Sequence, residues 1–139
     1  MAIPITIDKL LDENIVEWAR IEFKEGWNPD TTLKTISAFA NDIDNWGGGY
    51  VVIGIKENKG AIEKPIIGLS KERIDFIQKE IVKYCKYIKP AYIPICEPVN
   101  YQGANLLLIW CPGGYERPYA CPKVPSGEKS EKIYYRKRF

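Results

Sequence analysis

Two stretches of the chain repeat apolar residues at the three- and four-residue spacing of a helix. The first is expected over about residues 31–41, where Asn28 caps the helix and Pro29 suits its first turn. The second is expected to run from its cap at Ser70 to about Ile88. Each stretch gathers its apolar residues on one face, so two amphipathic helices are predicted to pack on a common core.

Apolar runs without helical spacing predict the strands. Residues 50–55 are almost continuously apolar, which is typical of a central strand buried on both faces. Residues 18–24 alternate apolar and charged side chains and indicate a half-buried strand. Residues 93–99 and 105–111 flank a turn and predict a hairpin, and residues 133–136 predict a last strand. This order predicts an α/β (α+β) fold, a small mixed β-sheet with two main helices packed on it.

Four shorter segments complete this picture. Residues 8–11 predict a short helix, and residues 65–69 predict a short edge segment because they begin with a proline. Residues 112–130 lack any periodicity and indicate an extended surface loop. Gly47 to Gly49 precede a strand, whereas phosphate-binding glycine motifs follow one, so these glycines favour a tight turn.

Composition limits the possible functions. The 139 residues, of which 45% are hydrophobic, predict one domain over residues 1–139 with a substantial core. The chain has no histidine, which excludes Ser-His-Asp and Cys-His catalysis and histidine-containing zinc sites. Its four cysteines form no Cys-X-X-Cys motif, which favours reduced thiols in a cytoplasmic protein. The sequence contains neither a signal-peptide pattern nor a membrane-spanning apolar run, so no membrane association is expected.

Three glutamates and a lysine form the first candidate site. Glu17 and Glu22 are five residues apart, so they lie on opposite faces unless the strand bends or Glu17 belongs to a helical turn. Glu22 and Lys24 share a face, and Glu57 follows the carboxyl end of the strand over 50–55, where α/β sheets commonly bind ligands. Three carboxylates suit Mg²⁺ or Mn²⁺, and a metal-bound hydroxide requires no histidine. The alternative is a solvated strand face with a weak Glu–Lys pair.

A second candidate site follows from the uneven distribution of charge. Residues 1–70 carry 7 basic and 11 acidic side chains, a net charge of −4, whereas residues 71–139 carry 13 and 7, a net charge of +6. Basic groups surround two adjacent tyrosines near the C-terminus, where cations can neutralise phosphates and rings can stack on unpaired bases. The candidate binding residues are Lys123, Lys129, Lys132, Tyr134, Arg136, Lys137 and Arg138. The alternative is a packed terminal strand with solvated charges, in which one of Tyr134 and Tyr135 faces inward and the other outward.

Four motifs, taken in order, resemble those of the Schlafen AlbA-type domain family. They are Glu22-Phe23-Lys24, Ser37-Ala38-Phe39-Ala40-Asn41, Gly48-Gly49-Tyr50-Val51-Val52-Ile53-Gly54-Ile55 and Tyr134-Tyr135-Arg136. This family is described as DNA-binding and was once labelled divergent AAA. The resemblance implies a small mixed sheet with packed helices, often at the front of a longer bacterial regulator, and a nucleic-acid partner. It also implies that the chain is a piece of a longer protein.

The same resemblance implies a second activity. In Schlafen proteins, two glutamates and an aspartate of this domain form a metal-dependent RNA-cleaving site. By position, these residues fall on Glu17, Glu22 and Glu57, the last of which replaces the aspartate. Mg²⁺ or Mn²⁺ would be the cofactor, and Lys24 would steady charge on the phosphate. The sequence has no Walker lysine and therefore gives no support to an ATPase.

Three hypotheses follow from the sequence. The first is a DNA- or RNA-binding domain of a cytoplasmic protein resembling a bacterial transcriptional regulator, which contacts mainly the phosphate backbone. The second is the divalent-metal-dependent endoribonuclease just described. The third is a protein-interaction or oligomerisation module, for example a homodimer, in which the loop around Trp46 or the edge of the hairpin makes the contact.

Overall fold

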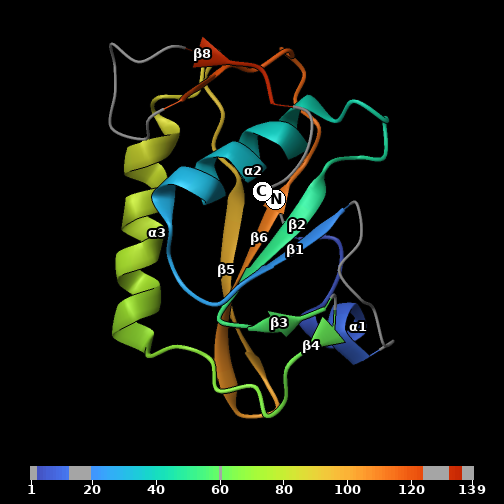
Figure 1. Ribbon diagram of the computed structural model, residues 1–139, viewed down its shortest axis with the longest axis vertical. Coiled ribbons are helices and arrows are strands. Elements are labelled where there is room, and N and C mark those ends of the chain that lie inside the picture. Colours follow the sequence, from blue (N-terminus) through green and yellow to red (C-terminus); the bar gives the residue numbers. More distant parts are fainter. Residues whose placement is uncertain (1–2, 13–19, 60, 124–131, 136–139) are drawn as a thin grey trace.

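A computed structural model describes residues 3–12, 20–59, 61–123 and 132–135 (Figure 1). Its centre is a four-stranded sheet in the order β1-β2-β6-β5. The strands are β1 (Ile21–Lys24), β2 (Gly49–Ile53), β5 (Ile95–Tyr101) and β6 (Ala104–Cys111). β1 runs parallel to β2, while the β2–β6 and β5–β6 pairs are antiparallel. The predicted mixed sheet is therefore confirmed, and β2 is an inner strand whose residues are all buried.

Two helices cover one face of this sheet (Figure 1). They are α2 (Pro29–Asn41) and α3 (Lys71–Cys85), which begin at the predicted caps. Asn28 Oδ1 accepts a hydrogen bond from the Thr31 backbone N–H over 3.3 Å, and Ser70 Oγ accepts one from that of Arg73 over 3.1 Å. The apolar faces of both helices pack on residues of β2 and β6 in one core cluster. Its aliphatic members include Leu33, Ile36, Val51, Ile53, Ile74, Ile77, Ile81, Leu107 and Ile109.

A second core cluster lies on the opposite face of the sheet. The short helix α1 (Ile7–Asp12) packs there against the alternate side chains of the strands, among them Phe23, Val52 and Leu108. A small hairpin of β3 (Glu57–Asn58) and β4 (Ala61–Ile62) follows β2 and adds Ile62 to this cluster. None of the described helices has the length and apolar character to cross a membrane.

The structure corrects the prediction for residues 112–130, because their described part includes buried residues. Tyr119, Ala120 and Cys121 are buried. β7 (Cys121–Pro122) pairs with β8 (Lys132–Ile133) in a separate two-stranded sheet. Strands of two residues show no periodicity, and their burial depends on partners distant in the chain. The predicted last strand therefore exists, but it belongs to this small sheet, named here the β7–β8 ribbon.

Two smaller differences have equally local causes. Residues 65–69 form no strand, and the Leu69 backbone N–H instead donates to Asn105 O over 2.9 Å. α3 ends at Cys85 rather than near Ile88, which lies buried in the following turn. The predicted glycine turn holds for Gly47 and Gly48, whose φ values are +88° and +87°, and an added Cβ at Gly48 would clash with Cys111 O, whereas Gly49 already belongs to β2.

The buried side chain of Asn41 helps to attach the β7–β8 ribbon to the rest of the molecule, in addition to the backbone pairing of Ala120 with Lys89. Asn41, the last residue of α2, is only 9% exposed. Its Nδ2 donates to Tyr119 O over 3.1 Å and to Tyr135 O over 2.8 Å. Its Oδ1 accepts a hydrogen bond from the Tyr119 backbone N–H over 2.6 Å. Both the segment that leads into β7 and the segment that leaves β8 are thus bound to a single amide, which we call the Asn41 clamp.

Loss of the Asn41 clamp should destabilise the fold. Asn41→Ala removes three hydrogen bonds and leaves buried backbone groups without partners, so the free energy of unfolding should fall by about 2–4 kcal/mol. Urea denaturation followed by tryptophan fluorescence measures this loss. Asn58→Ala, at an exposed asparagine of β3, is the control and should change stability by less than about 0.5 kcal/mol. Equal effects of the two substitutions would contradict a structural role for the clamp.

Candidate nucleic-acid interface

The two adjacent tyrosines after β8 face in different directions, as alternation predicts. Tyr135 packs against the core under α2 and α3, and the Lys34 ammonium lies 5.7 Å from the centre of its ring. Tyr134 is 59% exposed. Because the Asn41 clamp binds the carbonyl of Tyr135, it fixes the backbone beside Tyr134. The exposed ring therefore projects from a segment that is held in place.

Positive charge lies next to the β7–β8 ribbon in the sequence. Lys123 follows β7 directly and is exposed, and Lys132 on β8 pairs with Pro122 across the ribbon. Lys34 pairs with Asp30 over 2.9 Å, and the hydrogen bond that its ammonium donates to that carboxylate raises the pKa of the lysine. The remaining predicted binding residues, Lys129, Arg136, Lys137 and Arg138, lie outside the described residues.

A groove lies beside Tyr134 at the C-terminal end of α2 and has a volume of about 490 Å³. We call it the α2-end groove, and its lining residues are Asn41, Asp42, Ile43, Asn45, Arg117, Pro118 and Tyr134. Arg117 Nη1 donates to Asn41 O over 3.3 Å and to Asp42 O over 3.1 Å, so the guanidinium caps the helix. The same nitrogen lies 3.6 Å from Asp42 Oδ2.

Sequence reasoning missed both Arg117 and Asp42 as members of this site. Arg117 falls in the segment predicted to be a surface loop, and only the fold brings it to the end of α2. For Asp42 a signal was available, because Asp tolerates the left-handed conformation in which helices often end. Its φ is 42°, and its carboxylate accepts the backbone N–H groups of Trp46 over 2.9 Å and of Gly47 over 3.0 Å. Asp42 thereby shapes the loop that borders the groove.

The acidic candidate site lies elsewhere, at the end of the parallel pair β1 and β2. Glu22 and Lys24 share the face under α2, as predicted, and Lys24 Nζ donates to Thr31 Oγ1 over 3.3 Å. Glu22 is only 8% exposed, so the prediction of a half-buried strand with a solvated polar face was wrong at this residue. The strand lies under α2 on one side, which short-range alternation does not predict.

Glu57 is the first residue of β3, in the hairpin that follows β2. The backbone N–H groups of Gly54 and Ile55 both donate to Lys24 O, so the chain that leads to Glu57 leaves the sheet beside Lys24. Glu57 Oε2 is buried and has no hydrogen-bond partner within the part of the chain that the structure describes. Glu17 lies outside that part, and no three Cys, Asp or Glu side chains within it gather in a form that would hold a metal ion.

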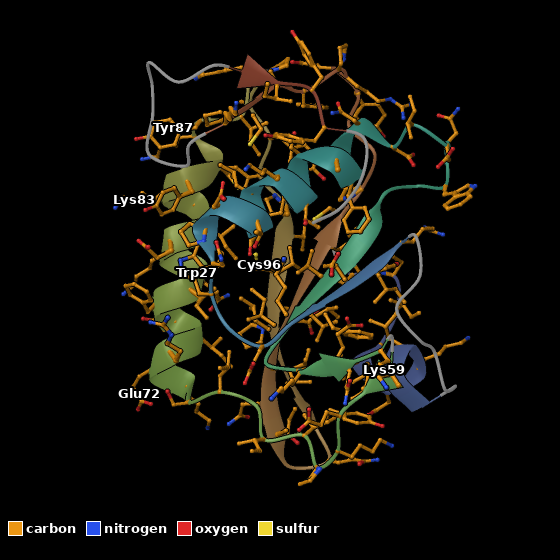
Figure 2. All side chains as sticks on the ribbon, viewed as in Figure 1. Trp27, Lys59, Glu72, Lys83, Tyr87 and Cys96 are labelled. Atoms are coloured by element: carbon orange, nitrogen blue, oxygen red, sulfur yellow. The ribbon has the colours of Figure 1, made fainter. Side chains whose placement is uncertain are left out.

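The four cysteines come together in the core although they are distant in the sequence. Cys85, Cys111 and Cys121 are buried in the cluster under α2 and α3, and Cys96 packs against it (Figure 2). All four are free thiols. Burial raises the pKa of Cys96 to about 12 and raises those of Cys85 and Cys111 as well. These three groups therefore stay protonated at neutral pH and provide no ready nucleophile.

Comparisons with known proteins agree with this architecture. The N-terminal domain of a protein from Nitrosomonas europaea, named as related to the ATP-dependent DNA helicase RecG, has a solution NMR structure with a TM-score of 0.63 and 26% identity. That match covers 94% of this chain and 86% of the other. The crystal structure of the DIP2311 protein from Corynebacterium diphtheriae gives a TM-score of 0.48 and 21% identity, covering 83% of this chain and 22% of that one. A search of curated proteins found no match.

The family comparison covers nearly the whole sequence. The family model described as Schlafen, AlbA_2 matches residues 17–138, a span that contains all four motifs on which the resemblance depends. The motif asparagine now has a structural role, since Asn41 binds the backbone of the Tyr134-Tyr135-Arg136 motif at Tyr135. The chain belongs to the Schlafen AlbA_2 family.

Proposed function

We propose that this chain binds nucleic acid, mainly through the phosphate backbone, with the surface around the β7–β8 ribbon. The observation that carries the proposal is that an exposed lysine, Lys123, follows β7 and an exposed tyrosine, Tyr134, follows β8 of one ribbon that the buried Asn41 clamp helps to hold in place. Its family and its likeness to the domain of a RecG-related protein support a nucleic-acid-related role. Lys123 and Tyr134 are the proposed contacts whose side chains the structure describes, and Lys132 of β8 is a further proposed contact.

The electrostatics of this end of the molecule suit a polyanion. Lysine and arginine side chains bind phosphates by replacing condensed counterions and do not read the base sequence. The carboxylate of Asp42, next to the ribbon, accepts two backbone N–H groups and lies beside the Arg117 guanidinium, so its negative charge is compensated. Lys129, Arg136, Lys137 and Arg138 flank the ribbon in the sequence and are further proposed contacts.

The proposed binding also suggests a role for this domain in a longer protein. A phosphate-binding domain at the front of a bacterial, cytoplasmic regulator would deliver the rest of that protein to DNA or RNA. Binding through phosphates alone gives affinity with little sequence preference. Choice of target would then come from another domain or from features of nucleic-acid structure.

Salt titration tests the proposed function directly. Binding of labelled duplex DNA, measured by fluorescence anisotropy across a KCl series, should weaken linearly on a log–log plot, because each phosphate contact releases counterions. Lys123→Ala should weaken binding and reduce the slope by about 0.9. Lys59→Ala removes an exposed lysine at the opposite end of the molecule and should leave the slope unchanged (Figure 2). A flat salt response, or equal effects of both substitutions, would contradict the proposal.

A second candidate function, metal-dependent RNA cleavage, is favoured by one observation. The buried Glu57 Oε2 without a described partner is costly, and a cation beside it would offset that cost. Glu22 and Glu57 with Glu17 would hold Mg²⁺ or Mn²⁺, whose chemistry there is to activate water and to stabilise charge on phosphate. The described residues supply two of these carboxylates, so the fit depends on Glu17. Lys24, which shares the face of Glu22, would contact the substrate phosphate.

Cleavage of structured RNA in the presence and absence of Mn²⁺ tests this second function. Glu22→Gln and Glu57→Gln keep the side-chain size but remove the charge that a divalent ion requires, so each should lower the cleavage rate by at least about 100-fold. Gel analysis of the products measures the rate. Glu97→Gln, at an exposed glutamate of β5, should keep full activity. Cleavage that is unchanged in both site variants would assign the activity to a contaminant.

A further inference from the structure

We propose that the α2-end groove receives an unpaired nucleotide whose base stacks on Tyr134. This inference rests on the proposed function and names the ligand class for that surface. It predicts that single strands, loops and bulges bind more tightly than a regular duplex. Three features support it: the apolar lining of the groove, the held backbone beside Tyr134 and the compensated charge of Asp42.

The groove offers an apolar surface beside an aromatic ring. Its volume is about 490 Å³, and Ile43 and Pro118 line it together with Tyr134. Ile43 is 57% exposed and Tyr134 is 59% exposed, so both present apolar surface to solvent. A nucleobase has an apolar face that stacks on tyrosine and a polar edge that hydrogen-bonds. Asn45, which also lines the groove, carries both a donor and an acceptor for such an edge.

The backbone next to the ring is held in place before any ligand binds. Asn41 Nδ2 donates to Tyr135 O, and the same amide binds the backbone of Tyr119 across the ribbon. Arg117 in turn binds the carbonyls of Asn41 and Asp42 at the end of α2. A site whose walls are already held loses little conformational entropy on binding, which favours affinity.

The negative charge in the groove is compensated, so it does not prevent a nucleotide from binding. Among the lining residues that the structure describes, Asp42 contributes the one carboxylate. Trp46 N–H donates to Asp42 Oδ1 and Gly47 N–H donates to Oδ2, while Arg117 Nη1 lies 3.6 Å from Oδ2. These partners compensate the negative charge that would otherwise repel a phosphate. Beyond the groove, the exposed Lys123 on the ribbon is a partner for the phosphates that flank the base.

A paired base cannot use this surface. Within a duplex both faces of each base are covered by its neighbours, so no face is available to Tyr134. A base in a bulge or single strand has already lost part of its stacking and pays little to enter the groove. Stacking on an aromatic side chain contributes about 1–3 kcal/mol per base, which corresponds to a five- to 150-fold preference.

Two duplexes that share one labelled strand containing 2-aminopurine test this inference. In one duplex this base is paired with thymine, whereas in the other the complementary strand lacks that thymine and leaves the 2-aminopurine as a single-residue bulge, and anisotropy measures the affinity of each. The bulged duplex should bind about five- to 150-fold more tightly, and stacking should quench the 2-aminopurine fluorescence. Tyr134→Ala should abolish both effects, whereas Tyr134→Phe, which retains the ring, should preserve them. The exposure of Tyr134 makes the alanine variant compatible with folding.

A matched pair of isoleucine variants tests the groove itself. Ile43→Glu places a negative charge on the groove wall and should remove the preference for the bulge. Ile67→Glu makes the same change at a residue that is 87% exposed and is not part of the groove lining, and it should keep the preference. Thermal unfolding of both variants confirms that each is folded.

The outcomes separate this inference from the proposed function. Salt-dependent binding with equal affinity for both oligonucleotides would overturn the inference and leave the proposed function intact, whereas no binding to either would overturn both. A bulge preference that survives Tyr134→Ala would place the base elsewhere and overturn the inference. Equal affinities together with a change of oligomeric state in Ile43→Glu but not Ile67→Glu would identify the groove as a protein contact.

Discussion

The arrangement of the candidate binding surface depends on the Asn41 clamp. Tyr119 and Tyr135 are 78 and 94 residues from Asn41 in the chain, yet one buried amide binds the backbone of both. The β7–β8 ribbon has only two paired residues in each strand, and so short a ribbon is not stable by itself. Its attachment to α2 therefore comes from the clamp and from the packing of Tyr119, Cys121 and Tyr135 on the core. The Ser37–Asn41 motif and the Tyr134–Arg136 motif are therefore parts of one structural unit.

Pairing within the sheet separates the two candidate sites. Gly49, at the start of β2, pairs with Cys111 of β6, so the segment that leads to Arg117 and the ribbon begins at this end. Lys24 pairs with Ile53 at the other end of β2, and the hairpin with Glu57 follows there. The five residues of β2 span roughly 17 Å, so one nucleic acid would have to run along this length to meet both sites. Binding and cleavage, if both occur, would therefore use different parts of one ligand.

Local signals in the sequence were sufficient for most of the fold. The caps at Asn28 and Ser70, the buried run of β2 and the turn between β5 and β6 depend on neighbours in the chain, and each was predicted correctly. The burial of Glu22 and of Tyr119 depends on α2, which covers one and clamps the other through Asn41. The spacing of apolar and polar residues along the chain does not reveal contacts between distant segments. The groove was missed for the same reason, because its residues come from three separate segments that long-range contacts bring together, among them the Asn41 clamp and the hydrogen bonds of Arg117.

The absence of histidine and the burial of the cysteines reduce the number of groups that could cleave RNA. The sequence has no histidine, and burial raises the pKa of Cys85, Cys96 and Cys111, so these thiols remain protonated at neutral pH. Cleavage of RNA would then depend on the carboxylates near Lys24 and on a metal ion that they hold. Binding through the ribbon needs none of these carboxylates, since its contacts lie at the other end of β2. The two proposed functions are thus physically separable, and binding by the ribbon would not require cleavage at the acidic site.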